Sequence, residues 1–447
     1  MRPVGSPLGG FPLISQTSYS MNIQIKNGRL IDPKNNIDTR IDVYVAEGKI
    51  AALGKAPDGF RAIRVIDAAG LVVCPGLIDL SARLREPGFE YKATLESEML
   101  AAVAGGVTSL ACPPDTDPPL DEPGLVEMLK HRAKTLNLAH VYPIGALTIG
   151  LAGEQLTEMA ELRDAGCVGF SHADVPLQDN QVLWRALQYA ATFGFCVWLR
   201  PQDGYLAKDG VAHDGEVATR LGLPGIPAFA ETIAIASIIE LMRATGARVH
   251  LCRLSTREGV GMVRAAKREG LALTCDIGIH HAHLSEMDLG YFDSHCHLQP
   301  PLRSGRDRDA LREGLKDGTI DAICSDHTPV DEDSKQLPFG ESEAGATGLE
   351  LLLPLTLKWA LEMKVPLAQA LARVTQEPAR VLGLNSGHLS VGHIADVCVF
   401  DPEQYHRVSA AELRSQGKNT PFLGIELPGK VRYTLVQGQI VYEAGSG

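Results

Sequence analysis

The chain has 447 residues, of which 45% are hydrophobic and 21% charged, a composition typical of a folded protein and not of a disordered one. Its formal net charge of -12 argues against a nucleic-acid partner, because phosphate contacts need clustered lysines and arginines. There is no run of eighteen apolar residues, so no membrane span is predicted. The nine cysteines form no C-x-x-C pair and lie in apolar runs, which favours reduced thiols and a cytoplasmic protein.

The first twenty residues are broken by proline and glycine, which argues against a signal peptide and predicts a flexible N-terminal arm, with an upstream start-codon artefact as the alternative. From Met21 to residue 76, apolar residues alternate with polar ones, and turn signals stand at Asn27-Gly28, Glu47-Gly48 and Ala69-Gly70. This pattern predicts a run of short antiparallel strands.

From residue 77 to 383 short apolar stretches alternate with helical patterns, as in "VTSLACPP" followed by "GLVEMLKHRAKTLN". Such alternation predicts parallel β/α units, and a (β/α)8 TIM-like barrel needs roughly 250 residues. A doubly wound open sheet is the alternative, although no Gly-x-Gly-x-x-Gly turn follows an early strand. Residues 384–447 return to strand alternation. We therefore predict an α/β protein whose barrel, residues 77–383, is inserted into a small β-sandwich domain formed by residues 21–76 and 384–447.

Active sites of such barrels lie at the carboxyl ends of the strands, so the residues that follow each predicted strand are the candidates. An arginine there usually forms a salt bridge at the rim, but several charged residues around one mouth point to a site. The residues in these positions are Arg83, Asp115, His172, Arg200, Arg253 and Asp326.

The chain contains the segments "GLIDLSARLREPG", "DTDPPLDEP", "GLPGIPAFAE", "QPPLRSGRDRDAL", "DGTIDAICSDHTP", "TGLELLLPL", "EPARVLGL", "NTPFLGIEL" and "VRYTLVQGQIV". In combination they resemble the dihydroorotase family of the cyclic amidohydrolase superfamily, over about residues 21 to 443. The resemblance implies a β/α barrel with a small β domain, and a zinc-dependent, reversible ring closure of carbamoyl aspartate to dihydroorotate.

The chain departs from the family at the positions of the metal ligands. The family's first strand carries His-x-His where this chain has Ser81 and Arg83, and two further histidine positions align with Arg200 and Arg253. A guanidinium has no lone pair to offer and does not deprotonate in proteins, so it cannot bind zinc. The bridging position aligns with His172 or Ala173, which leaves Asp326 as the one retained ligand. The sequence therefore predicts no metal and no cofactor.

The substrate contacts are altered as well. Arg85, which in the family grips a substrate carboxylate, is retained, whereas a family asparagine aligns with Asp115 and a family histidine with Val330. We expect Arg83, Arg200 and Arg253 to replace the lost metal cations and to neutralise Asp326 and neighbouring carboxylates.

The sequence offers two other candidate sites. The histidines at 280, 281, 283, 295 and 297 could form a relocated metal site, with structural histidines as the alternative. A hydrolase triad with Ser81 as the nucleophile has no Gly-x-Ser-x-Gly elbow to support it.

The leading prediction is a catalytically inactive dihydroorotase homologue, a pseudoenzyme of pyrimidine biosynthesis. It resembles the non-catalytic dihydroorotase-like subunits that accompany aspartate carbamoyltransferase in some bacteria. This implies the transferase catalytic chain as partner, within a hetero-oligomeric complex that holds several copies of each chain. The alternatives are an anion-binding module, with Arg85 and Arg303 contributing, and a residual zinc-dependent amidohydrolase.

Overall fold

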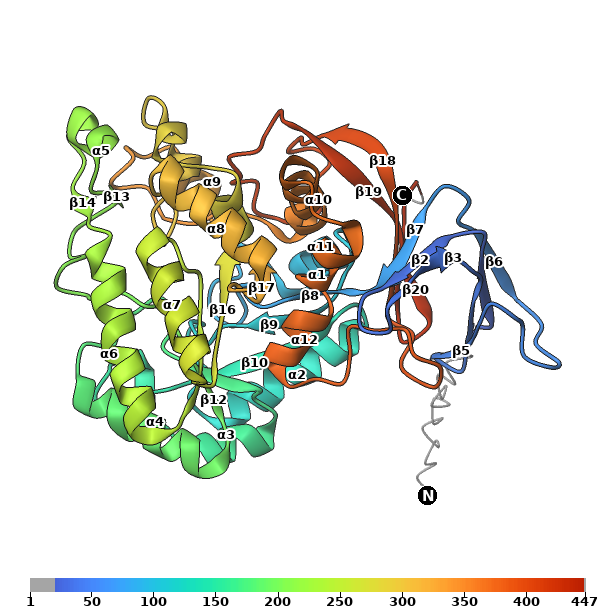
Figure 1. Cartoon of the computed structure of the whole chain (residues 1–447), viewed down its shortest axis with the longest axis horizontal. Coiled ribbons are helices and arrows are strands. Elements are labelled where there is room, and N and C mark those ends of the chain that lie inside the picture. The colour runs from blue at the N-terminus through green and yellow to red at the C-terminus, as the bar shows by residue number, and fades with distance from the viewer. Residues whose placement is uncertain (1–20, 446–447) are drawn as a thin grey trace, which may run out of the picture.

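The computed structural model describes residues 21–445, so the predicted arm at residues 1–20 lies outside the described part. Its largest sheet has eight parallel strands in the order β17-β16-β15-β12-β11-β10-β9-β8 (Figure 1). In chain order these are β8 (Leu77–Asp79), β9 (Val107–Cys112), β10 (His140–Ala146), β11 (Gly169–Ser171), β12 (Cys196–Leu199), β15 (Arg248–Leu251), β16 (Leu273–Gly278) and β17 (Ala322–Cys324).

The two outer strands of this sheet meet just beyond their carboxyl ends. Ala82 and His327 form a parallel bridge, in which the Arg83 N–H donates to the His327 carbonyl at 2.9 Å and the His327 N–H donates to the Ser81 carbonyl at 3.1 Å. The sheet is thereby nearly closed into a barrel. The predicted TIM-like fold is confirmed, and the open doubly wound sheet is excluded.

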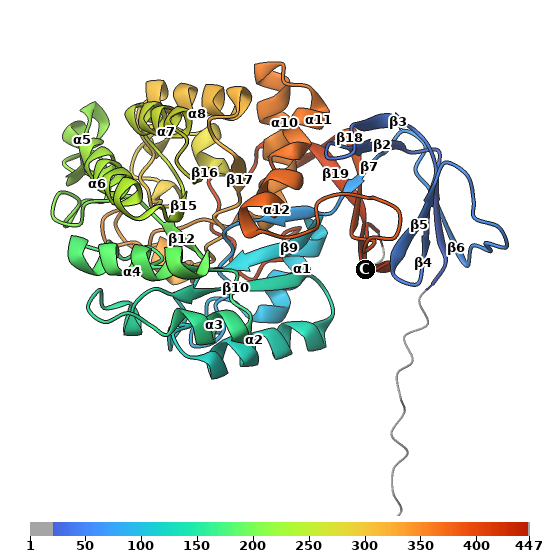
Figure 2. The ribbon, with the colours of Figure 1, turned by 60° about the horizontal axis from the view of Figure 1, so that its bottom comes forward.

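Helices surround the barrel on its outside (Figure 2). They are α1 (Leu95–Ala104), α2 (Pro123–Leu136), α3 (Met159–Ala165), α4 (Asn180–Phe193), α6 (Phe229–Thr245), α7 (Arg257–Glu269), α8 (Gly305–Asp317), α10 (Leu352–Met363), α11 (Leu367–Ala372) and α12 (Gln376–Leu382). None of the helices within residues 21–445 is long and apolar enough to cross a lipid bilayer.

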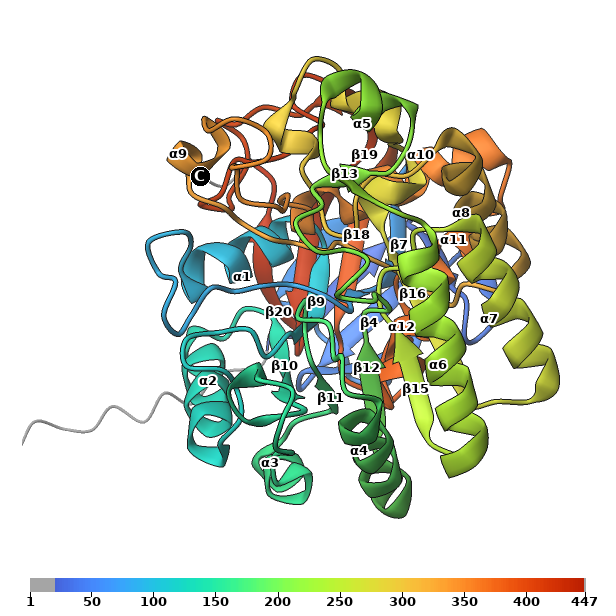
Figure 3. The same ribbon diagram turned by 90° about the vertical axis from the view of Figure 1, so that its left-hand side faces the viewer.

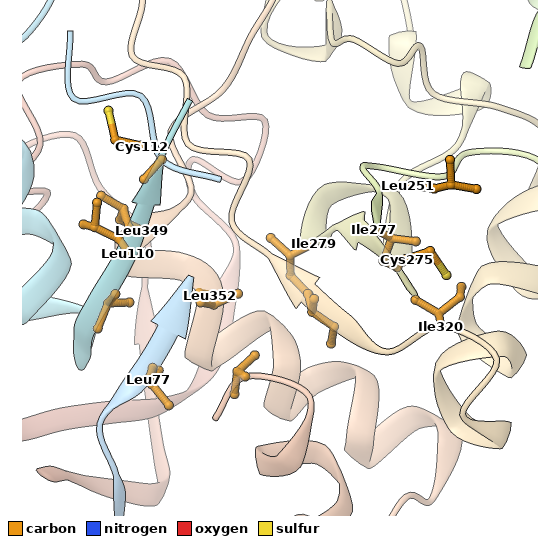
Figure 4. Packing of buried hydrophobic residues seen from close by; sticks show 14 of the residues in the cluster. Leu77, Leu110, Cys112, Leu251, Cys275, Ile277, Ile279, Ile320, Leu349 and Leu352 are labelled. Atoms are coloured by element: carbon orange, nitrogen blue, oxygen red, sulfur yellow. The ribbon is translucent and has the colours of Figure 1, made fainter. Parts of the chain in front are cut away.

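The local sequence explains this alternation of strands and helices. All six residues of β9 are buried, as expected for a strand covered on both faces. Helix α7 is capped by Thr256, the residue before it, whose side chain accepts a hydrogen bond from the Gly259 N–H, and the helix buries Val260 and Val263 on one stripe. Leucines, isoleucines and cysteines of strands and helices pack together in the core (Figure 4).

Two further sheets lie beside the barrel and pack on each other through a second apolar cluster that includes Ile25, Val73 and Val397. One sheet has the order β5-β4-β1-β6 and the other β20-β19-β18-β7-β2-β3. Strands from both ends of the chain meet in the second sheet, where β7 pairs antiparallel with β18. The strands are β1 (Ile23–Lys26), β2 (Arg29–Asp32), β3 (Ile37–Arg40), β4 (Val43–Ala46), β5 (Lys49–Leu53), β6 (Arg64–Asp67), β7 (Val72–Pro75), β18 (Val397–Arg407), β19 (Glu426–Val436) and β20 (Gln439–Glu443).

The prediction of consecutive antiparallel strands in residues 21–76 was only partly right. Glu47-Gly48 does connect the antiparallel pair β4 and β5, but β1 and β2, on either side of Asn27-Gly28, lie in different sheets. Each pairs in parallel with a later strand, β1 with β6 and β2 with β7. A side chain at Gly28 would lie 2.6 Å from Val73 Cγ2, so this glycine lets the chain pass closely between the sheets.

Long loops cover the end of the barrel where the strand carboxyl ends open (Figure 3, upper part). They carry β13 (Ala212–His213), α5 (Glu216–Leu221), β14 (Gly225–Ile226) and α9 (Glu332–Lys335). Leu289, Leu298, Leu302 and Phe339 form a small apolar core within this cover. The residues at the strand ends therefore lie beneath a packed layer of loops.

Candidate functional site

The strand ends bring three predicted arginines together at the barrel mouth. Arg83 follows β8, Arg200 follows β12 and Arg253 follows β15, and each side chain is about 5% exposed or less. Three buried cations in contact would repel one another strongly, so each of them needs a carboxylate partner.

Asp174 is the carboxylate that contacts all three arginines, and sequence reasoning missed it. Its Oδ2 accepts from Arg83 at 2.6 Å, and its Oδ1 lies 3.0 Å from Arg200 Nε and also accepts from Arg253. Burial disfavours the ionised form, yet Arg253, Arg83 and Arg200 together hold the pKa of Asp174 well below its usual range. Counting charges in the sequence could have found Asp174, because the predicted strand ends supply three arginines but only two carboxylates.

Of the two residues that sequence reasoning placed at the bridging position, His172 points elsewhere. Its Nε2 lies 2.8 Å from the Thr148 hydroxyl and its Nδ1 lies 2.8 Å from the Val175 carbonyl. Ala173 offers no polar side chain. The acidic residue one position further on, Asp174, takes the central place instead.

Asp326, which follows β17, pairs with two of the three arginines. Its Oδ1 accepts from Arg253 at 2.9 Å and lies 3.5 Å from Arg83. Burial raises the pKa of Asp326, and Arg253 and Arg83 oppose this rise. Arg200 makes its ion pair with Asp174, so it neutralises a neighbouring carboxylate and not Asp326 directly.

Asp115 completes the cluster by accepting from Arg83 Nε at 2.7 Å. The mouth thus holds three guanidinium groups and three carboxylates, which we call the Arg–Asp cluster. Its members are Arg83, Arg200, Arg253, Asp115, Asp174 and Asp326. The formal charges of the six groups cancel, which is the arrangement that makes burial of ionised side chains tolerable.

The other predicted site residues lie around the Arg–Asp cluster without joining its ion pairs. Arg85 donates from Nε to the Pro329 carbonyl at 2.9 Å, and its NH2 lies 3.7 Å from Glu343. Val330 is buried, and its N–H donates to Asn419 at 3.0 Å. Ser81 lines a cavity of about 20 Å³ beneath the cluster.

The residues at the mouth do not fit the zinc ions that the resemblance implies. A zinc site needs at least three nitrogen, oxygen or sulfur ligands with free lone pairs, and three of the matching positions carry guanidinium groups. The carboxylates already accept hydrogen bonds from these arginines, and the cavity below them has room for about one water molecule. No group of three or more His, Cys, Asp or Glu side chains within residues 21–445 is arranged to hold a metal.

The histidines between residues 280 and 297 do not converge on one point. His281 Nε2 lies 3.0 Å from the Pro300 carbonyl, His283 Nε2 lies 2.9 Å from the Leu355 carbonyl, and His297 Nδ1 lies 3.0 Å from the Ser342 hydroxyl. Burial lowers the pKa of His281, like that of His283 and His297, to about 4. These contacts favour the structural alternative for the tract.

The side chains of His327 and Arg303 each have partners of their own, away from Ser81 and from the Arg–Asp cluster. His327 cannot serve Ser81 as a base, because its Nε2 lies 2.6 Å from Glu98 and its Nδ1 accepts from the Gly348 N–H. Arg303 donates to the Ile226 carbonyl and to the Ser255 hydroxyl, at the loop layer and outside the Arg–Asp cluster.

Asp79, at the end of β8, gives the stability a defined pH dependence. Burial raises its pKa to about 6, although hydrogen bonds from Ser325 and Ser81 oppose the rise. The unfolded chain loses this proton near pH ~4, so the folded state holds the proton more tightly between about pH 4 and pH 6. The stabilisation by protonated Asp79 is therefore complete below the pKa of this group in the unfolded chain. It is lost as the pH rises through the pKa of Asp79 in the folded protein, about 6.

We expect the free energy of unfolding of the natural protein, relative to that of Asp79→Asn, to fall between about pH 4 and pH 6, as measured by urea titration at each pH. Parallel curves for the two proteins would show that Asp79 does not carry this dependence.

Comparisons with known proteins agree with this architecture. A family model described as dihydro-orotase-like matches residues 70–259, and the amidohydrolase family model matches residues 207–441. The chain is 46% identical to a dihydroorotase-like protein of Pseudomonas aeruginosa, covering 95% of this chain and 100% of that protein. It is 45% identical to a dihydroorotase-like protein of Pseudomonas putida, with 94% and 99% covered. A dihydroorotase of Geobacter sp. strain M21 is 43% identical, with 95% and 100% covered.

Solved structures share the fold at lower identity. The L-hydantoinase (dihydropyrimidinase) of Arthrobacter aurescens superposes with a TM-score of 0.84 at 26% identity, covering 95% of this chain and 97% of that one. A D-hydantoinase superposes with a TM-score of 0.81 at 23% identity, covering 95% and 96%, a likeness that concerns the fold alone.

Proposed function

Because the chain belongs to the dihydroorotase-like group of the amidohydrolase family, we propose that it is a catalytically silent member that acts as a structural subunit. Its role is the assembly and activity of aspartate carbamoyltransferase in pyrimidine biosynthesis. The observation that carries the proposal is the Arg–Asp cluster, whose arginines occupy the strand-end positions from which the family's histidines hold zinc.

The chemistry of the cluster supports the loss of catalysis. Hydrolysis of a cyclic amide needs an activated water and a group that polarises the carbonyl. Asp326 is the one retained ligand, and its Oδ1 accepts from Arg253 at 2.9 Å. One carboxylate alone cannot hold a metal that activates a water, because catalytic zinc needs at least three ligands. Guanidinium groups stay protonated at physiological pH, so they cannot accept a proton from that water. The cavity lined by Arg83 and Arg253 measures about 20 Å³ and the one lined by Arg200 about 80 Å³, both well below the roughly 300 Å³ of an ordinary ligand pocket.

The retention of the fold supports a structural role. Buried strands, capped helices and the packed loops over the mouth are all present, although the site beneath them is altered. A subunit that a partner recognises still needs a packed core to hold its surface in shape, even when it no longer catalyses a reaction.

Co-expression with the cognate aspartate carbamoyltransferase catalytic chain tests this function. We expect the two chains to elute together as a hetero-oligomer on size-exclusion chromatography. Transferase activity should fall when this chain is omitted, because the catalytic chain then lacks its scaffold. A transferase that keeps both its size and its activity without this chain would contradict the proposed role.

Anion binding is a second candidate function, favoured by one observation. Arg85 lies outside the Arg–Asp cluster, and its nearest carboxylate, Glu343, is 3.7 Å away and also bonds to Lys92. Titration calorimetry with carbamoyl aspartate tests it, with Arg85→Met as the matched variant. An anion-binding module would release heat that this variant loses, whereas a scaffold alone gives the same baseline for both proteins.

A further inference from the structure

Two cysteines from opposite ends of the chain face each other in the six-stranded sheet. Cys74 in β7 lies directly opposite Cys398 in the antiparallel strand β18. Both side chains are fully buried on the barrel-facing side of the sheet, since their neighbours Val73, Val397 and Val399 belong to the other apolar cluster. All nine cysteines of the chain are free thiols.

The pairing class of these residues follows from a neighbouring hydrogen bond. The Gly76 N–H donates to the Asp396 carbonyl at 2.9 Å, which makes 76 and 396 a hydrogen-bonded pair. Hydrogen-bonded and non-hydrogen-bonded pairs alternate along an antiparallel ladder, so Cys74 and Cys398, two positions further on, are again a hydrogen-bonded pair. The Cα atoms of such a pair lie about 5.5 Å apart, which is within the usual range for a disulfide. The two side chains are farther apart than those of a non-hydrogen-bonded pair.

We propose that Cys74 and Cys398 form a reversible disulfide that links β7 to β18 in the six-stranded sheet when the protein meets an oxidant. Two S–H bonds break and one S–S bond forms, while the N=N group of a diazene oxidant such as diamide takes up the two electrons and two protons to become a hydrazine. Because the side chains must bend toward each other, the bond is strained and therefore readily reduced.

The surroundings of the pair determine when this reaction occurs. Burial and the neighbouring Cys398 thiol raise the pKa of Cys74 well above its usual value, so little thiolate is present in the closed state. Gly106 packs against Cys398, where an added Cβ would come within 2.6 Å of Sγ. The oxidant must therefore reach the pair during local opening of the sheet. This inference concerns a part of the molecule separate from the Arg–Asp cluster and is independent of the proposed function.

Mass spectrometry of the oxidised full-length protein tests the proposal. The folded protein is treated with diamide, its remaining thiols are alkylated in denaturant, and it is digested without reduction. We expect the peptide linked through Cys74 and Cys398 to be the most abundant crosslink and to disappear after incubation with glutathione. Cys398→Ser should lose this link. Cys167→Ser removes a buried thiol of the barrel, away from the six-stranded sheet, and should retain the link.

The unfolded chain provides the control that needs no variant. Diamide treatment in urea should spread the crosslinks over many of the nine cysteines, because nothing then holds these two together. The proposal is overturned if the folded protein yields no Cys74–Cys398 peptide, or if that peptide is no more abundant than after oxidation in urea.

Discussion

Replacing Asp174 with alanine should lower the free energy of unfolding by about 2 kcal/mol, less than the ~3–5 kcal/mol lost from a fully buried ion pair, because the Asp174 side chain is 29% exposed. Asp174 accepts from Arg83 and Arg253 and forms an ion pair with Arg200, so its loss leaves three guanidinium groups with two carboxylates. An unpaired cation is then held in a poorly hydrated mouth. Denaturant titration monitored by circular dichroism gives the change in midpoint and slope.

Two further variants separate the effect of charge balance from that of any lost side chain. Asp317→Ala removes a half-exposed carboxylate that pairs with Arg264 at 2.7 Å, and we expect it to change stability by less than about 1 kcal/mol. Asp174→Ala combined with Arg200→Met restores equal numbers of cations and anions and should recover part of the loss. If Asp174→Ala behaved like Asp317→Ala, the ion pairs of the mouth would not be a stabilising element. The same reasoning predicts a lower melting temperature for Asp326→Ala, and an unchanged one would contradict it.

The second large expected effect concerns the hydrolysis of dihydroorotate, one direction of the reversible reaction of the family. We expect no hydrolysis of dihydroorotate by the purified protein, with or without added zinc, above the rate of Asp326→Ala. The reason is the chemistry of the ligand positions, since Arg83, Arg200 and Arg253 repel a divalent cation and offer it no lone pair. The measurement is the loss of dihydroorotate with time, followed across neutral and alkaline pH.

A zinc-dependent amidohydrolase of the same family, assayed in parallel, confirms that the conditions support ring opening. Zinc-stimulated turnover that Asp326→Ala abolishes would revive the alternative of a residual enzyme. Metal analysis of the same preparation adds an independent measurement, because a functional site would retain zinc in proportion to protein.

Much of the architecture could be predicted from the sequence because its signals are local. The alternation of apolar strands such as "VTSLAC" with amphipathic helices predicts parallel β/α units without any knowledge of distant contacts. Pairing of the strands between residues 21 and 76 could not be predicted in this way. The turn signal at Asn27-Gly28 describes the backbone at one point, whereas the tertiary structure decides that β1 and β2 join different sheets.

The sequence could locate most of the charged residues at the barrel mouth, but neither Asp174 nor the contacts among them. Strand ends located Arg83, Arg200, Arg253 and Asp326, because in a barrel those positions face one mouth. Asp174 escaped notice since its importance comes from partners that lie 26, 79 and 91 residues away in the chain. Position after a strand indicates which residues meet, but only the three-dimensional arrangement assigns which carboxylate each guanidinium contacts.

The mutual dependence of the six charges at the mouth limits which substitutions it tolerates. Exchanging a single arginine for a neutral histidine leaves the Arg–Asp cluster one positive charge short, and exchanging a single aspartate leaves it one negative charge short. Replacing these residues one at a time would therefore pass through variants less stable than the natural protein, whereas replacing an arginine and an aspartate together preserves neutrality. Interlocked ion pairs of this kind make the six positions exchangeable as a set and resistant to single substitution.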